Sequence, residues 1–401
     1  MDGGLRRDAE FPLTRAEALD RLRDFLPRAG ADYARLRNVD HGPGQHDHVS
    51  RLSAALRRRL LSESEVVAAV IARHGLRGAE KFLSEVLWRS YWKGWLEQRP
   101  AVWPGYRQAL ARAEAACAAD PDLARRHQAA IDGRTGIDCF DHWMGELAET
   151  GYLHNWARMQ FASIWVFTLG LAWELGAALT LRLLRDADPA SNTLSWRWVA
   201  GLHTTGKAYL ADAARIHAMT GGRFTPDGLA RHAVIPEDSI AVPPATSPRA
   251  HRRPDPTEPA LLLVTPEDLS LETEAAMARL DIRAIAALPP TTAPDRRAMA
   301  DALDRAGAHW GLSPSECADL SGLVDLARRC GARQIVTGYL PVGPEADRLS
   351  PLRAAAGAAG IALAEHQRDW DVRVWPHCRK GFFALKEQMP RLLAGLGAAD
   401  G

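Results

Sequence analysis

Residues 150–209 constrain the fold of this chain more than any other stretch, because they carry charged and amide side chains inside a largely apolar, helix-forming sequence. Asn155, Arg158 and Met159 fall at positions i, i+3 and i+4, so they share one face of a predicted helix. A Pro-broken turn and a second helix follow, and this part carries Asp186, Asp188, Asn192, Trp196 and Trp198. We therefore interpret the region as a site rather than as plain core.

The chain has 401 residues, of which 47% are hydrophobic, so it is long enough for two cores. A stretch crowded with proline and charge interrupts it, as is typical of a linker. Beyond this stretch, short apolar runs alternate with predicted helices at about 270–279, 294–309, 313–331, 345–359 and 381–394. We predict an all-helical domain over residues 1–224, a Pro-rich linker over 225–258, and a smaller α/β domain with a parallel sheet over 259–401.

Charge and motifs exclude several functions. The net charge is only +1, so contact with DNA would need a local groove instead of a basic surface overall. The five cysteines are scattered without a CxxC motif, so we expect no metal site. No Rossmann glycine motif or P-loop follows the predicted strands. No signal peptide or apolar run of membrane length is present, and we expect a cytoplasmic chain without a membrane partner.

Two further motifs contain candidate site residues. Ser50 and Ser53 stand at the start of a predicted helix, where hydroxyls and free backbone amides suit an anionic phosphate. The alternative is that both are ordinary helix caps. Glu85, Trp88 and Arg89 share one face of a later helix. An aromatic stripe at this spacing is usually core, but the carboxylate in the same stripe favours a site.

These motifs resemble the flavin-binding domain of the photolyase/cryptochrome family. The family pattern reads roughly TGWMHNxxRM and then DGDxAxNxxxWxW, and this chain has TGYLHNWARM and DADPASNTLSW. The family's TSRLSPYL motif corresponds to VSRLSAAL at residues 49–56, in which Val49 replaces a threonine and removes one hydroxyl. The likeness covers residues 14–224, about half of the chain. It implies a photolyase-like all-α domain that binds FAD noncovalently.

The resemblance also implies roles for the cofactor residues. Arg158 would pair with Asp186, Asp188 would accept a hydrogen bond from a flavin ring N–H, and Asn192 would face the nitrogen that changes protonation on reduction. Tyr33 would approach the phosphates. The full set implied to bind FAD is Tyr33, Arg37, Ser50, Arg51, Leu52, Ser53, Arg89, Asn155, Arg158, Asp186, Asp188 and Asn192.

On the substrate side, the resemblance implies a pocket for a flipped-out cyclobutane pyrimidine dimer, built from Glu85, Trp88, Asn155, Met159 and Trp198. Aromatic rings suit stacking on bases, and one carboxylate suits their polar edges. The histidine pair of the (6-4) branch of the family is not evident. Trp196 and Trp173 resemble two members of the family's electron relay. The third member has no counterpart at the ungapped position. Either Trp165, Trp143 or Trp103 takes its place, or the relay is short.

The order of domains departs from the family. The α/β antenna domain that precedes the flavin domain in the family is missing from the front of this chain. The segment after residue 330, with its GFFALKE run, resembles the closing part of that domain. The α/β domain is thus either a permuted antenna-like domain or an unrelated module. Whether a second, antenna chromophore binds stays open.

Three functions follow from the resemblance. The first is a deoxyribodipyrimidine photolyase-like lyase that uses light and reduced FAD to repair DNA containing pyrimidine dimers. The second is a cryptochrome-like blue-light photoreceptor, and the third is a photolyase-like flavoprotein with unrelated chemistry. Glu85 and Trp88 favour repair, because a sensor needs no dimer pocket. The near-neutral charge and the incomplete relay favour the other two, and the oligomeric state stays open.

Overall fold

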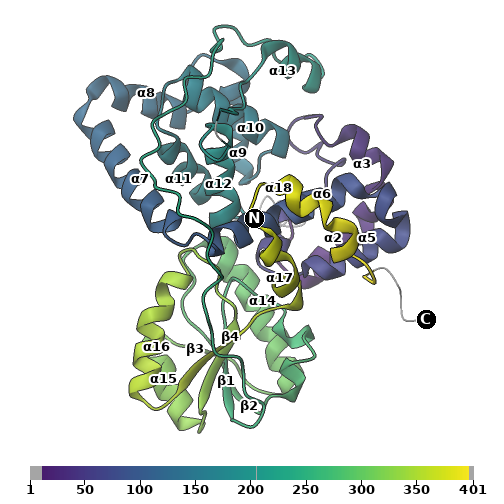
Figure 1. The fold of residues 1–401 in the computed structure, drawn as a ribbon, viewed down its shortest axis with the longest axis vertical. Helices are drawn as coiled ribbons and strands as arrows, with labels where there is room; N and C mark the ends of the chain where they lie inside the picture. Colours follow the sequence, from purple (N-terminus) through teal and green to yellow (C-terminus); the bar gives the residue numbers. More distant parts are fainter. Residues whose placement is uncertain (1–10, 205, 397–401) are drawn as a thin grey trace.

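A computed structural model describes residues 11–204 and 206–396. Helices form one part of the molecule and a sheet with its covering helices forms the other (Figure 1). The helical part consists of α2 (Arg15–Phe25), α3 (Ala31–Leu36), α4 (Ser53–Arg57), α5 (Glu63–Gly78), α6 (Glu80–Glu97), α7 (Val102–Ala119), α8 (Pro121–Ile131), α9 (Asp138–Thr150), α10 (Asn155–Ser163), α11 (Trp173–Leu183), α12 (Pro189–Val199) and α13 (Ala213–Met219). No helix in the described ranges is both long and apolar enough to cross a membrane.

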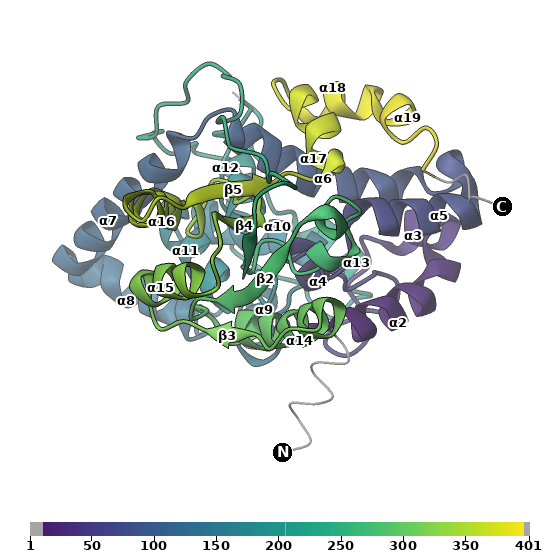
Figure 2. The same cartoon turned by 90° about the horizontal axis from the view of Figure 1, so that it is seen from below.

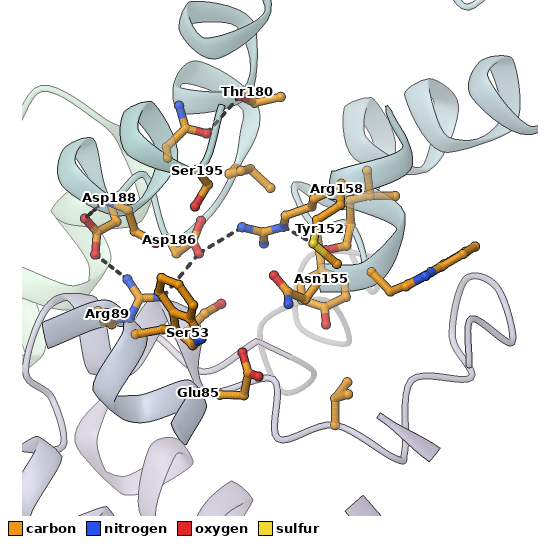
Figure 3. Close-up of a pocket in the computed structure, with 18 of the residues that line it drawn as sticks. Ser53, Glu85, Arg89, Tyr152, Asn155, Arg158, Thr180, Asp186, Asp188 and Ser195 are labelled. Atoms are coloured by element: carbon orange, nitrogen blue, oxygen red, sulfur yellow. Dashed lines mark hydrogen bonds and ion pairs between the residues drawn. The ribbon is translucent and has the colours of Figure 1, made fainter. Parts of the chain in front are cut away.

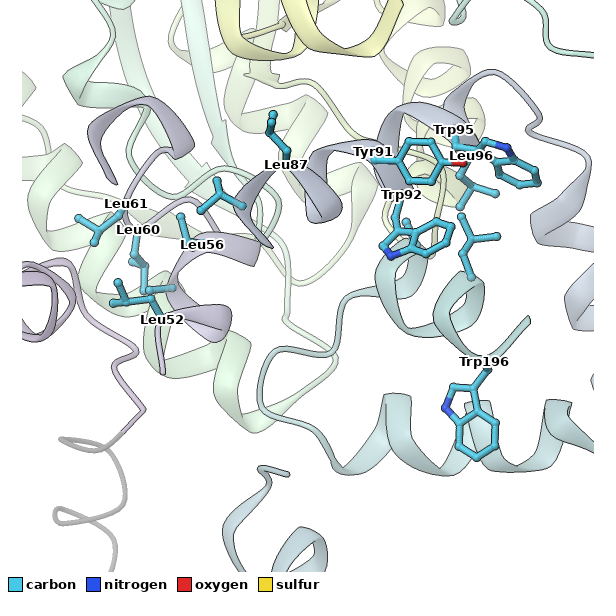
Figure 4. Packing of buried hydrophobic residues seen from close by; sticks show 14 of the residues in the cluster. Leu52, Leu56, Leu60, Leu61, Leu87, Tyr91, Trp92, Trp95, Leu96 and Trp196 are labelled. Carbon is cyan, nitrogen blue, oxygen red and sulfur yellow. The ribbon is translucent and has the colours of Figure 1, made fainter. Parts of the chain in front are cut away.

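Helix α6 lies at the centre of the helical part. It packs on α3, α5 and α12, and its aromatic and leucine side chains form a buried stripe. Figure 4 shows this stripe, with Leu87, Tyr91, Trp92, Trp95 and Leu96 following α6. One face of α6 is therefore committed to the core, while Glu85, Trp88 and Arg89 remain on a face that lines a cavity.

The second part contains a five-stranded sheet in the order β3-β2-β1-β4-β5, with every pair parallel. Its strands are β1 (Ala260–Val264), β2 (Ile282–Ala287), β3 (Ser315–Glu316), β4 (Gln334–Gly338) and β5 (Ala362–His366). Its helices are α14 (Ala293–Trp310), α15 (Leu320–Arg329) and α16 (Leu349–Ala358). The predicted fold class, a helical domain followed by an α/β domain with a parallel sheet, is confirmed.

Side chains of β1 alternate between the two faces of the sheet. Leu261 and Leu263 belong to the core under α15 and α16, whereas Leu262 and Val264 join the core that continues into the helical part. Both faces of the strand are buried, as is usual for a parallel sheet covered on both sides. One face of the sheet therefore shares a hydrophobic core with the helical domain, and the other face has a core of its own under α15 and α16.

Two local predictions were wrong. Residues 270–279 form only two short 3-10 turns, η3 (Leu271–Thr273) and η4 (Met277–Arg279), instead of a helix. The helix expected over 313–331 begins at Leu320, because Pro314 and the short strand β3 precede it. Strand β3 has two residues, too few to produce an alternating pattern.

The C-terminal helices α17 (Asp369–Val374), α18 (Phe382–Glu387) and α19 (Met389–Leu392) follow the sheet, and α17 and α18 pack on α6 (Figure 2). The indole N–H of Trp370 donates to Ser90 Oγ at 2.8 Å, and the ring of Phe382 stacks on Trp88 at 3.7 Å. The sequence pattern predicts one α/β unit over residues 259–401. It does not predict that the last helices of this segment pack on the helical domain. Buried apolar side chains alone do not indicate which surface they cover.

Glu97 at the end of α6 joins the two domains. Its buried carboxylate accepts a hydrogen bond from Tyr339 Oη at 2.6 Å and a second from the backbone N–H of Val342. Burial raises the pKa of Glu97 to about 7, although these two hydrogen bonds and the nearby charge of Arg249 act in the opposite direction. The folded protein therefore holds a proton on this carboxyl at pH values where the unfolded chain has lost it.

We predict that Glu97→Gln removes part of the pH dependence of stability. A raised pKa means that the stabilisation is complete below pH 4.5 and is lost as the pH rises through 7. Between pH 5 and pH 8 this group should lower the free energy of unfolding of the wild type by ~2–3 kcal/mol. Denaturant unfolding at both pH values measures the difference, and equal pH dependence in the two proteins would contradict the prediction.

Candidate functional site

A cavity of about 470 Å³ lies between α6, α10 and α12. Its volume is in the range of cofactor and ligand sites. Figure 3 shows side chains from these separate helices pointing into the same space. All but two of the residues that the sequence assigns to catalysis, cofactor binding or the relay line this cavity, and the two exceptions are Leu52 and Trp173.

Asp186 and Asp188 reach the cavity from the loop between α11 and α12. Asp188 is the N-cap of α12, since its Oδ1 accepts a hydrogen bond from the N–H of Ser191 at 3.0 Å and Pro189 fills the first helical position. Ala187 between them has a φ of +42°, which is unfavourable for a residue with a Cβ. The loop is thus held in a strained conformation that places both carboxylates on the cavity wall.

Two arginines neutralise these aspartates. Arg158 on α10 donates to Asp186 Oδ2 at 3.2 Å, as the family resemblance implies. Arg89 on α6 pairs with Asp188 and lies 3.6 Å from Asp186. Burial alone would raise the pKa of Asp186, but Arg158 and Arg89 lower it to about 2. The pKa of Asp188 is also lowered, mainly by Arg89 against the effect of burial. Both carboxylates are therefore charged at neutral pH.

Asn192 is held by α11. Its Nδ2 donates to the carbonyl of Ala177 at 2.8 Å, and its Oδ1 lies 2.8 Å from the hydroxyl of Thr180. The same hydroxyl accepts a hydrogen bond from the indole N–H of Trp196 at 2.9 Å. These contacts fix the amide and leave one N–H and one oxygen lone pair of Asn192 for a ligand.

Ser50, Arg51 and Ser53 line the opposite end of the cavity. Helix α4 begins at Ser53, as predicted, and no side chain caps its first amides. Arg51 has a φ of +56°, which turns the chain sharply before the helix. The side chain of Leu52, which the resemblance assigns to the cofactor, is fully buried in the hydrophobic core (Figure 4).

The substrate-side residues also line the cavity, but two of them have partners that the sequence did not indicate. Glu85 forms an ion pair with Arg37, and burial raises the pKa of Glu85 although Arg37 lowers it. Trp88 has one ring face covered by Phe382. Trp198 packs against Tyr209, with ring centroids 5.7 Å apart.

Sequence reasoning missed several lining residues, namely Tyr152, Thr180, Ser195 and Tyr209. Thr180 had a signal, since it is the one hydroxyl residue in the apolar run of α11. Tyr209 lies beyond α12, and only the folded chain brings its hydroxyl to Gln160 Nε2 at 2.5 Å. Tyr152 packs beside the guanidinium of Arg158, 5.7 Å from ring centroid to Cζ.

Of the two relay tryptophans, Trp196 lines the cavity and Trp173 does not. Trp173 is buried against Tyr106, with centroids 5.6 Å apart. Trp165 lies 6.1 Å from Trp196. Among the described residues no cluster of three or more His, Cys, Asp or Glu side chains is arranged to hold a metal ion.

Comparison with known proteins gives a consistent result. Residues 82–237 match the family model described as the FAD binding domain of DNA photolyase. A deoxyribodipyrimidine photo-lyase of Streptomyces griseus is 34% identical, with 49% of this chain and 44% of that protein covered. A deoxyribodipyrimidine photo-lyase of Thermus thermophilus is also 34% identical, with 56% of this chain and 51% of that protein covered. The chain therefore spans about half the length of these relatives.

A solved structure of a bacterial class III photolyase from Agrobacterium tumefaciens is similar at 26% identity, with a TM-score of 0.42 and with 52% of this chain and 43% of that chain covered.

The residues of the cavity fit FAD. Hydroxyls and arginines at the end formed by Ser50 and Ser53 suit a diphosphate. The buried carboxylates, Arg158 and Asn192 at the other end offer the donors and acceptors that a flavin ring requires. Residues 82–237 are thus similar to the FAD binding domain of DNA photolyase, and the cofactor of this domain is FAD.

Proposed function

We propose that this chain repairs cyclobutane pyrimidine dimers in DNA by a light-driven reaction that depends on reduced FAD. One observation carries the proposal: a single cavity is lined both by the cofactor residues and by Glu85, Trp88, Asn155, Met159 and Trp198. A flavoprotein without a base-sized substrate does not need aromatic rings beside a carboxylate at this place. Bound FAD would supply the electron that opens the dimer when light excites it.

The chain would hold the cofactor with charges that are already in place. Asp186 and Asp188 are charged and fixed by Arg158 and Arg89, so little reorganisation accompanies binding. Asn192, held by Thr180 and α11, presents its amide in one orientation. Together, these side chains would bind the flavin ring of FAD and orient it.

On the substrate side, the chain would bind two unstacked pyrimidines. Trp88 offers the ring face that Phe382 leaves free, and Trp198 is half-buried on α12. The carboxylate of Glu85, paired with Arg37, offers acceptor oxygens to the polar edges of the bases. Asn155 and Met159 lie on the same helix face, and Asn155 adds an amide to the base edges.

The test is a repair assay with a dimer-containing oligonucleotide and the chemically reduced protein. Restoration of the pyrimidines under blue light, and none in the dark, is the expected result. Undamaged DNA should not compete strongly, since its bases stay stacked. Absence of light-dependent repair on single-stranded and double-stranded substrate would overturn the proposal.

We further predict that Glu85→Gln cuts repair about tenfold while FAD content stays at the wild-type level, the scale of one lost charge-assisted hydrogen bond. Glu85 pairs with neither Asp186 nor Asp188, and its partner Arg37 keeps its positive charge in the variant, so FAD binding should be retained. Repair yield per absorbed photon and the flavin absorbance measure the two effects. Unchanged repair in this variant would show that Glu85 does not contact the substrate.

A second candidate is a cryptochrome-like photoreceptor, which one observation favours. The C-terminal helix α18 covers a face of Trp88 through Phe382, so part of the aromatic wall already has an intramolecular partner. In a photoreceptor, light should alter this contact without repair. Accelerated proteolysis of the C-terminal segment under light, together with a negative repair assay, would support this candidate over the first.

A further inference from the structure

The loop that carries Asp186 and Asp188 is held from the side that faces away from the cavity. Arg58 donates to the carbonyl oxygen of Arg185 at 2.7 Å, and Arg57 Nε lies 3.4 Å from the carbonyl oxygen of Ala187. These carbonyls stand on either side of Asp186, within the strained turn. Two arginines at the end of α4 therefore fix the backbone from which the cavity carboxylates project.

Both arginines are neutralised by the α/β domain. Arg58 is fully buried, and its Nε donates to Asp295 Oδ1 at 2.8 Å in the first turn of α14. The hydroxyl of Thr292 donates to the other oxygen of Asp295 at 2.5 Å. Arg57 donates to Glu267 Oε1 at 2.8 Å and to the carbonyl of Pro266 at 2.6 Å, directly after β1. The acids that balance these charges thus come from outside the helical domain.

The position of these contacts in the sheet is informative. The order β3-β2-β1-β4-β5 changes direction between β1 and β4, and in sheets of this kind ligands bind at the carboxyl ends of the strands at that point. Here Arg57 contacts the segment after β1, and Glu97 contacts the segment after β4. The cavity that remains at this edge measures about 20 Å³, which is room for about one water.

We propose that Asp295 and Glu267 of the α/β domain are positioning residues for the flavin site. They orient Arg58 and Arg57, which hold residues 185–187 and so set the direction of the Asp186 and Asp188 carboxylates. In a free-standing α/β domain, a ligand would bind at the carboxyl ends of β1 and β4. In this chain, the same edge of the sheet supports residues 185–187 of the helical domain. The inference rests on the proposed flavin site and adds the α/β domain to it.

Removal of Asp295 should affect the loop strongly, because among the described residues it is the one carboxylate within ion-pair distance of Arg58. A buried guanidinium without a counter-charge moves or draws in water, and its hydrogen bond to Arg185 then loses its geometry. Arg57 loses less in Glu267→Gln, since it keeps the carbonyl of Pro266.

The experiment compares Asp295→Asn with Asp371→Asn in the full-length chain. Asp371 accepts two hydrogen bonds from Arg59 at 2.6 and 2.8 Å. Asp371→Asn therefore disrupts a buried ion pair of the arginine that directly follows Arg58. None of the contacts of Arg59 in the described structure reaches residues 184–188. FAD affinity of the apoprotein, visible circular dichroism of the bound flavin and thermal unfolding of the apoprotein are measured for each.

Asp295→Asn should weaken FAD binding about tenfold and change the flavin dichroism, whereas Asp371→Asn should lower only the unfolding temperature. A wild type that does not bind FAD would refute the proposed function itself. The positioning role would be overturned if Asp295→Asn bound FAD as tightly as the wild type. It would also be overturned if both variants lost FAD affinity in proportion to their loss of thermal stability. If Asp295→Asn does not fold, Glu267→Gln takes its place in the same comparison, and its affinity for FAD should fall about threefold.

Discussion

Arg158→Ala should purify almost free of flavin, with its affinity for FAD reduced at least ~100-fold, about 3 kcal/mol. Arg158 neutralises Asp186 in a buried site, and its Nε also donates to the carbonyl of Leu153 at 2.8 Å. Without it, the remaining ion pair of Asp186 within the part of the chain that the structure describes is the longer contact to Arg89 at 3.6 Å. The pKa of Asp186 should then rise from about 2, because burial is no longer offset by two arginines.

Arg158→Lys is the matched control for this prediction. A lysine keeps the positive charge but cannot donate to Asp186 and to Leu153 at once with a planar group, so an intermediate loss of affinity is expected. Fluorescence titration of the apoprotein with FAD gives the three affinities, and thermal unfolding of the same samples shows whether the fold is kept. FAD bound by Arg158→Ala as tightly as by the wild type would remove Arg158 from the cofactor site.

Much of the fold could be predicted from local pattern. The apolar runs that contain β1, β2, β4 and β5 are short and alternate with predicted helices, so the sequence indicated strands there. The docking of α17 and α18 on α6 could not be predicted, because the stack of Phe382 on Trp88 joins residues almost three hundred positions apart. A sequence pattern shows that a side chain is buried, but it does not show against what.

The candidate site shows the same limit. The pairing of Arg158 with Asp186 was implied by the family resemblance of two motifs, and the structure contains this ion pair. The pairing of Glu85 with Arg37 and the support of Arg58 by Asp295 depend on contacts between distant segments. Leu52 was assigned by its place in a motif, but motif positions that bind through the backbone leave the side chain free to enter the core.

Trp198→Ala should weaken binding of a dimer-containing oligonucleotide by about 5- to 150-fold, which corresponds to ~1–3 kcal/mol for the loss of one stacking surface. Trp198 is better suited to this test than Trp88, because Trp88 also stacks on Phe382 and its truncation would loosen the C-terminal helices. The described ring contact of Trp198 is with Tyr209, at 5.7 Å, on the same cavity wall. Affinity for undamaged DNA should change little, since phosphate contacts supply most of it.

Tyr209→Phe is the control for the Trp198 prediction, because it keeps the ring beside Trp198 and removes only the hydroxyl that contacts Gln160. It should bind the dimer-containing oligonucleotide like the wild type. Both variants should keep their flavin, since neither residue contacts the Arg158, Asp186 and Asp188 group. Wild-type affinity of Trp198→Ala for damaged DNA would mean that the bases stack elsewhere, whereas equal loss for damaged and undamaged DNA would mean that Trp198 supports the backbone-binding surface instead of a flipped base.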